Sequence, residues 1–219
     1  MDDSRINNKW PFAKEGFPFI LTGLGLTLLF VFLGLVLVSI VAGTLTLFTM
    51  CFFRDPDRKN DVRHKSVFSP ADGRILEIKR LEDGNNPLGK PGHRISIFMS
   101  VFNVHVNRVP MAGTVKKIVY QPGKFFSANL DKASKHNENN RITLETSDFQ
   151  HIVVIQIAGL IARRIACWVE ESDYVEAGQR FGLIRFGSRL EIYLPDDALI
   201  TAQKGQKVKA GATVIGNMA

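Results

Sequence analysis

The sequence predicts a mostly β protein, a compact β-sandwich of the barrel-sandwich-hybrid kind that carries an N-terminal hydrophobic helical anchor. Three observations lead to this fold class. Residues 16–53 contain no charged side chain. From residue 54 onward, short segments with alternating apolar and polar residues are separated by Gly, Pro and Asn, as in sandwiches and barrels. A Val-x-x-Gly turn followed by a short apolar segment occurs twice, at 175–178 and 208–211.

Composition excludes several classes of protein. The 219 residues include 28 Lys and Arg against 21 Asp and Glu, a formal net charge of +7, and 45% are hydrophobic, which excludes a disordered chain. Two cysteines, Cys51 and Cys167, are too few for a disulfide scaffold. No pattern of zinc ligands or of a nucleotide-binding loop occurs, so we expect no metal. Basic residues are not interleaved with aromatic ones, so we expect no nucleic acid partner.

The uncharged run at 16–53 predicts a membrane anchor. It is nearly twice as long as the about 20 helical residues that cross a bilayer, and Gly34 and Gly43 are points where a helix could turn. Because both flanks are basic, the positive-inside rule places both ends in the cytoplasm. We therefore expect a helical hairpin in residues 1–53 of the cell (inner) membrane, with a single tilted helix as the alternative, and a domain of residues 54–219 on the cytoplasmic face. The basic flanking residues are Arg5, Lys9 and Lys14, then Arg54, Arg58, Lys59, Arg63 and Lys65.

The β domain is predicted from a series of short segments in order along the chain. Residues 121–141, rich in Asn and Lys, are interpreted as a polar loop, and Leu160–Arg164 as a turn of helix. The candidate strands are Arg74–Leu81, Arg94–Phe98, Val104–Val109, Gly113–Tyr120, Ile142–Thr146, Ile152–Ile157, Ala166–Glu170, Arg180–Phe186 and Arg189–Leu194.

A Gly187-Ser188 pair lies between two of these apolar segments, Phe181–Phe186 and Leu190–Leu194. On the residues alone, a turn is the favoured interpretation. A second chemistry is open to such a bond: the Ser188 hydroxyl can attack the Gly187 carbonyl and convert the amide to an ester. Elimination and hydrolysis then leave a pyruvoyl group on residue 188. Glycine suits the first position because it has no side chain to block the attack.

One predicted strand carries polar residues on a single face. His105 and Asn107 share a face with period 2, and Arg108 points to the other. A lone strand histidine is more often structural than catalytic, but burying several polar side chains on an apolar strand is costly without a purpose.

Two further motifs are open to a structural and a functional interpretation. Ser69-Pro-Ala-Asp72-Gly is typical of a turn, and its functional interpretation makes Asp72 a carboxylate that orients or activates a neighbour. Arg163 and Arg164, next to an apolar turn, could bind phosphate or form an ordinary solvated surface.

Four motifs in order resemble one enzyme family. They are Arg54-Asp-Pro-Asp-Arg58, Ser69-Pro-Ala-Asp-Gly73, Asn103-Val-His-Val-Asn-Arg-Val-Pro110 and Phe181-Gly-Leu-Ile-Arg-Phe-Gly-Ser-Arg189. Together they resemble the phosphatidylserine decarboxylases, in their short membrane-anchored form, from the hydrophobic anchor to the end of the chain. The resemblance implies a lyase of phospholipid biosynthesis that converts phosphatidylserine to phosphatidylethanolamine and carbon dioxide.

The resemblance also implies roles for individual residues. The proenzyme would cut itself between Gly187 and Ser188 into a β chain of residues 1–187 and an α chain of residues 188–219. Ser188 would become the covalent pyruvoyl group that forms a Schiff base with the substrate amine, without pyridoxal phosphate or metal. Asp72 would serve self-cleavage, and His105 would handle a proton in decarboxylation. Arg108 stands where longer members have a second histidine, so the self-cleavage triad is incomplete by this alignment.

The expected partners follow from the same resemblance. They are phosphatidylserine in the membrane and the chain's own second fragment, in a heterodimer that higher oligomers could contain. The candidates for substrate binding are Asn107, Arg108, Arg163 and Arg164. Two other functions stay open: decarboxylation of another serine-headgroup lipid such as archaetidylserine, and a non-enzymatic membrane-tethered lipoyl-like module. The latter predicts a modifiable lysine at the tip of a hairpin, and no Met-Lys-Met signature occurs.

Overall fold

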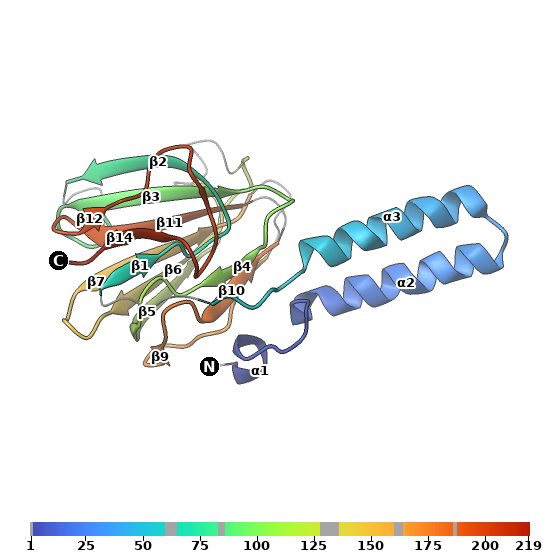
Figure 1. Cartoon of the computed structure of the whole chain (residues 1–219), viewed down its shortest axis with the longest axis horizontal. Coiled ribbons are helices and arrows are strands. Elements are labelled where there is room, and N and C mark those ends of the chain that lie inside the picture. The colour runs from blue at the N-terminus through green and yellow to red at the C-terminus, as the bar shows by residue number, and fades with distance from the viewer. Residues whose placement is uncertain (1, 60–64, 83–85, 128–135, 160–163, 186–187) are drawn as a thin grey trace.

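The computed structural model describes residues 2–59, 65–82, 86–127, 136–159, 164–185 and 188–219. It consists of a β domain from which a pair of helices projects at one end (Figure 1). The mostly β fold class predicted from the alternating segments is confirmed.

The projecting helices are α2 (Phe17–Phe32) and α3 (Val36–Phe52), which lie side by side and antiparallel (Figure 1). The chain reverses at Gly34, whose φ of 70° favours glycine, whereas Gly43 lies inside α3. The helices approach closely at Gly23, where an added Cβ would lie 2.5 Å from Thr46 Oγ1. Two shorter elements, α1 (Asp3–Ile6) and the 3-10 helix η1 (Lys14–Gly16), precede them.

The surface of this helical hairpin is apolar almost all round. Leu28 is 69% exposed and Phe32 is 87% exposed, and many other large apolar side chains of both helices are exposed. A helix that is apolar on every face requires an apolar environment. The segment Lys14–Phe32 is long and apolar enough to cross a membrane, and Val36–Phe52 is a shorter apolar helix.

The β domain is built around one eight-stranded antiparallel sheet. Its order is β13-β2-β3-β11-β7-β6-β5-β9, and two three-stranded sheets, β1-β14-β12 and β4-β10-β8, accompany it. The bounds in the large sheet are β2 (Gly73–Leu81), β3 (Gly92–Met99), β5 (Gly113–Gln121), β6 (Asn139–Glu145), β7 (His151–Ile157), β9 (Tyr174–Val175), β11 (Ser188–Pro195) and β13 (Lys207–Val208). The bounds in the small sheets are β1 (Ser66–Phe68), β4 (Val106–Arg108), β8 (Ile165–Cys167), β10 (Arg180–Ile184), β12 (Leu199–Ile200) and β14 (Val214–Asn217).

Every predicted strand has an observed counterpart, with shifted bounds. The segment predicted at Val104–Val109 is shorter than expected, so His105 lies just before β4. Residues 121–141 are not a loop throughout, because β5 extends to Gln121 and β6 begins at Asn139. Apart from Arg164, the turn predicted at Leu160–Arg164 lies outside the described residues, as do Arg63 and the end of the strand predicted to reach Phe186.

The two Val-x-x-Gly turns meet in space. Gly178 and Gly211 both have positive φ, and a Cβ added to Gly211 would lie 3.1 Å from Gly178 Cα. The turns follow β9 and β13, which are the two opposite edges of the large sheet. The sheet therefore curls until its edges approach each other, which encloses the core. All eight residues of β11, at its centre, are buried.

Candidate active site

Ser188 lies at the start of β11, between two neighbouring strands. Its backbone pairs with Met99 at the end of β3, and the next residue, Arg189, pairs with Ile157 at the end of β7. The Ser188 side chain is fully buried and its Oγ donates to Met99 Sδ at 3.4 Å. Gly187, the predicted partner in cleavage, lies outside the described residues. The serine that the sequence singled out is thus held at the start of a strand that is buried throughout.

His105 is fully buried near the base of the helical hairpin, where α3 ends. Its Nδ1 lies 2.9 Å from the carbonyl oxygen of Asn103, and its ring packs on Phe52, with centroids 4.2 Å apart. Because a carbonyl only accepts, Nδ1 carries the hydrogen of the neutral ring. Nε2 then holds a lone pair, and it is buried without a hydrogen-bond partner in the described part of the chain.

The surroundings of His105 favour its neutral form. The pKa of His105 is lowered from 6.5 to about 4, mainly by burial and in smaller part by the positive charge of Arg54, against the opposing effect of the Asn103 carbonyl. Near neutral pH the ring is therefore uncharged. The Nε2 lone pair can accept a proton, and the low pKa means that the resulting imidazolium passes the proton on readily.

A row of buried side chains connects Asn107 to Ser188. The Asn107 amide nitrogen and the Ser188 hydroxyl both approach Met99 Sδ, the former at 3.7 Å. Gln156 donates to Asn107 Oδ1 at 2.8 Å and accepts from Asn140 at 3.0 Å. The sequence analysis did not select Gln156, although a glutamine inside the apolar strand Ile152–Ile157 was a visible signal.

His105 also lies beside the segment that leads to Ser188. The amide of Ile184 donates to the His105 carbonyl at 3.4 Å, and β10, which ends at Ile184, pairs with β4. Polar residues of β4 and the start of β11, about 80 residues apart in sequence, thus come to one buried region. The structure brings Asn107 and Ser188 together at Met99. Among the described residues no contact joins the His105 side chain to Ser188, and the catalytic roles of Ser188, Asp72 and His105 stay predictions.

Asp72 occupies a different position. Its Oδ2 accepts from Arg58 at 2.9 Å and its Oδ1 from the Ala210 amide at 2.7 Å, so both oxygens are engaged. The structure shows no contact between Asp72 and Ser188. The next residue, Gly73, has to be a glycine because β2 and β3 lie too close together there for a side chain. A Cβ at this position would lie 2.1 Å from the Phe98 carbonyl oxygen. Asp72 borders a basic cavity of about 780 Å³.

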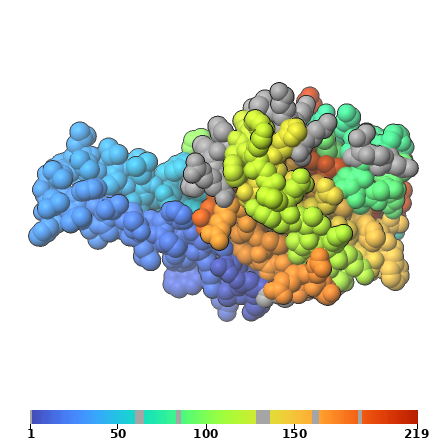
Figure 2. All heavy atoms as spheres, turned by 180° about the vertical axis from the view of Figure 1, so that it is seen from behind, coloured from blue at the N-terminus to red at the C-terminus, as the bar shows by residue number. Residues whose placement is uncertain are grey.

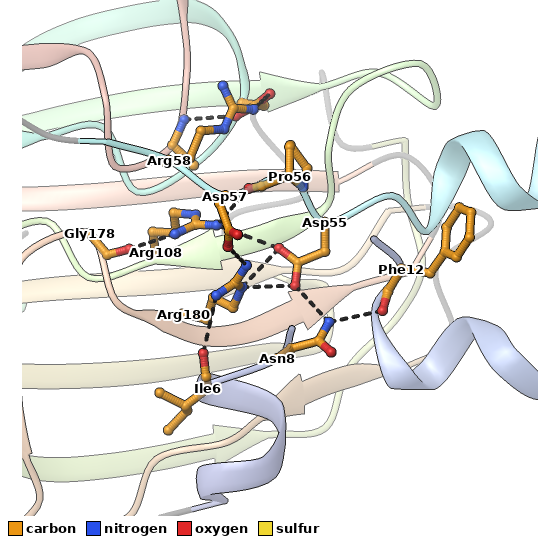
Figure 3. Close-up of polar contacts among 12 residues, drawn as sticks. Ile6, Asn8, Phe12, Asp55, Pro56, Asp57, Arg58, Arg108, Gly178 and Arg180 are labelled. Atoms are coloured by element: carbon orange, nitrogen blue, oxygen red, sulfur yellow. Dashed lines mark hydrogen bonds and ion pairs between the residues drawn. The ribbon is translucent and has the colours of Figure 1, made fainter. Parts of the chain in front are cut away.

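Arg108 belongs to a buried ion network (Figure 3). Asp55 receives Arg180 Nε at 2.9 Å and Asn8 Nδ2 at 3.1 Å, and its Oδ1 lies 3.5 Å from Arg108. Arg108 also donates to the carbonyls of Pro56 and Gly178, and burial lowers its pKa to about 10. The network fastens the segment after α3 to the β domain, and a substrate-binding role for Arg108 stays a prediction.

The arginine pair predicted to bind phosphate is partly described. Arg164 is exposed and borders a cavity of about 640 Å³ at the base of the hairpin, whereas Arg163 lies outside the described residues. The same cavity contains Arg185, which the sequence analysis did not select.

Comparison with known proteins gives a consistent result. The family model described as phosphatidylserine decarboxylase matches residues 45–216. A "Phosphatidylserine decarboxylase proenzyme" of Syntrophus aciditrophicus is 52% identical over 206 residues, covering 93% of this chain and 96% of the relative. Proteins with the same name from Desulfotalea psychrophila and Syntrophotalea carbinolica are 45% and 46% identical, over 95% and 96% of this chain and 97% and 98% of their own lengths.

Proposed function

The chain belongs to the phosphatidylserine decarboxylase family, and on that premise we propose that it converts phosphatidylserine to phosphatidylethanolamine with a pyruvoyl group made from its own Ser188. The family is one of decarboxylase enzymes, which replaces the lipoyl-like carrier considered from the sequence. The relatives are named proenzymes, in keeping with a chain that must be processed.

The surroundings of Ser188 fit a pyruvoyl group. The residue begins a strand that is paired on both sides, with β3 and with β7. A new chain end at Ser188 would therefore stay in place after cleavage, and the fragments 1–187 and 188–219 would stay associated as a heterodimer. This position is the observation that carries the proposal.

A pyruvoyl group at residue 188 would supply an electrophilic carbonyl for the substrate amine and an electron sink for the carbon that loses carbon dioxide. The side chains of this chain manage the protons. His105 Nε2 accepts a proton from the substrate's ammonium group and returns one to that carbon after carbon dioxide has left. Burial of Met99, Asn107 and His105 keeps water away, which favours the loss of the carboxylate charge.

Self-cleavage requires a base that takes the proton of the Ser188 hydroxyl. Arg108 cannot serve, because a guanidinium holds its proton at neutral pH. We propose His105 for this step as well, since its Nε2 is buried and unpartnered. Asp72 would have to leave Arg58 before it could act on a proton, so we assign it to shaping the region around the start of β2.

The hairpin accounts for access to a lipid substrate. We propose that α2 and α3 insert into the cell membrane, with both ends and the β domain on the cytoplasmic face, because the basic residues flank both ends. The substrate then reaches the enzyme without leaving the bilayer.

The decisive experiment is the intact mass of the purified chain under denaturing conditions. We expect two chains that separate between residues 187 and 188, the smaller beginning with a pyruvoyl group. Borohydride reduction in the presence of phosphatidylserine should attach lipid to the smaller chain alone. Ser188→Ala should give one uncut chain that forms no phosphatidylethanolamine. An uncut Ser188→Ala chain with normal activity would refute the proposal.

A further inference from the structure

A cavity lies where the hairpin meets the β domain. We call it the junction pocket; it has a volume of about 640 Å³. Figure 2 shows the N-terminal segment, in dark blue, against the orange strands at the base of the hairpin. Because α2 begins here, the pocket lies at the level of the bilayer surface if the hairpin is inserted. Its lining includes Lys14, Glu15, Phe19, Arg164, Trp168 and Arg185.

The junction pocket has an excess of positive charge. One oxygen of Glu15 is engaged: Oε1 lies 2.7 Å from Arg5 Nε and accepts from Trp168 Nε1 at 3.0 Å, whereas Oε2 is buried without a hydrogen-bond partner among the described residues. Lys14, Arg164 and Arg185 have no carboxylate partner within the part of the chain that the structure describes. Three cations around one cavity repel each other, and the repulsion is stronger where water is partly excluded.

Arg185 experiences this repulsion most directly. It is half-buried, and its guanidinium lies 5.3 Å from the centre of the Phe19 ring in α2. Burial and the charge of Arg164 lower the pKa of Arg185, and the smaller opposing effect of the Glu15 carboxylate does not cancel them. An anion placed between the two guanidiniums would remove the repulsion and could accept bidentate hydrogen bonds, which suits phosphate oxygens.

We propose that the junction pocket binds the phosphodiester of a membrane glycerophospholipid, held by Arg164, Arg185 and Lys14. Phe19 and the apolar face of α2 would then lie along the acyl chains. The proposal rests on the proposed function only in requiring that the hairpin be in a membrane. Arg185 precedes Ser188 by three residues, so their Cα atoms are at most about 11 Å apart. The bound phosphodiester can therefore belong to the substrate or to a neighbouring lipid.

The test uses the full chain in micelles of dodecyl maltoside, a detergent without phosphate, and the short-chain lipid dihexanoyl-phosphatidylglycerol. This probe has a phosphodiester but no amine, so its binding does not depend on the pyruvoyl group. The chain has two tryptophans; in a Trp10→Phe background, the fluorescence of Trp168 reports on the pocket directly. We expect saturable binding that weakens at high salt. Uncut Ser188→Ala protein should bind equally, which separates this proposal from the proposed function.

Matched variants assign the binding to the pocket. Lys14→Gln and Arg164→Gln should each weaken binding about tenfold, as expected for the loss of a charge-assisted hydrogen bond. Lys117→Gln, an exposed residue of β5 with the same change in charge, should have no effect.

Three results would overturn the proposal. The first is equal binding by the Lys14→Gln/Arg164→Gln double variant and the wild-type chain. The second is equal binding of dihexanoylglycerol, which has no phosphate. The third is inorganic phosphate binding as tightly as the lipid, which would identify a free phosphate as the ligand. Tighter binding of dihexanoyl-phosphatidylserine to the Ser188→Ala chain would support the substrate as the source of the phosphodiester, and equal binding a neighbouring lipid.

Discussion

Asp55→Asn is expected to destabilise the protein strongly, because Asp55 holds together three segments that are distant in sequence. The Asp55 side chain is 1% exposed and receives Arg180 on both oxygens, at 2.9 and 2.8 Å. Arg108 and Asn8 complete its environment (Figure 3). An asparagine would leave two buried guanidiniums facing each other without a full negative charge between them.

The magnitude follows from the burial of this network. Removal of one partner from a buried ion pair costs about 3–5 kcal/mol. For a domain of this size that corresponds to a decrease in Tm of about 6–20 °C. Asp57 provides a matched control, since it also pairs with Arg180, at 2.7 Å, but its side chain is 88% exposed. Asp57→Asn should lower Tm by no more than about 4 °C.

The assay is thermal unfolding of the full chain in detergent, followed by circular dichroism, for the wild type and the two variants. Limited proteolysis between residues 54 and 59 gives a second readout, because Asp55→Asn should release this segment from the β domain. Equal decreases in Tm for Asp55→Asn and Asp57→Asn would show that burial does not set the strength of the network, and would refute the reasoning.

Three further predictions concern His105 and the hairpin. His105→Ala should leave a folded chain whose rate of phosphatidylethanolamine formation is about 10²–10⁴-fold lower, measured per cut chain; a normal rate would make the histidine structural. Between pH 6.5 and about 4 the unfolded chain binds a proton on His105 that the folded chain does not, so stability should decrease as pH falls through this range. His105→Gln should lose that part of the dependence, and identical Tm profiles for variant and wild type would contradict it. A tag at Met1 should react with a membrane-impermeant reagent only after cells are opened; labelling of intact cells would exclude the hairpin topology.

Much of the fold was predictable because strands of five or more residues leave a periodic pattern. β2, β3, β5, β7 and β11 were each anticipated within a few residues. β9, β12 and β13 have two residues each and owe their existence to pairing with distant strands, so no local pattern marks them.

The candidate site also has features that the sequence predicts and features that only the fold shows. The grouping of His105 with Asn107 followed from strand periodicity, since both lie on one segment. The contacts of Asn107 with Gln156, and of Arg108 with Asp55, join residues far apart in sequence, and only the folded chain reveals them. Arg185 gained significance from its distance to Phe19, which belongs to another element.

The contact between Phe52 and His105 bears on how the protein can be prepared. Phe52 is the last residue of α3 and is 1% exposed, and its ring also meets Phe53, which stacks on Phe19. The last residue of the helical hairpin, Phe52, thus covers one side of the His105 ring. A water-soluble version made by deleting residues 1–53 would expose the His105 ring to solvent. The pKa of His105 would then return toward its ordinary value of 6.5. A shortened protein should therefore lack only the turns of α2 and α3 that lie far from the β domain, so that Phe19, Phe52 and Phe53 remain.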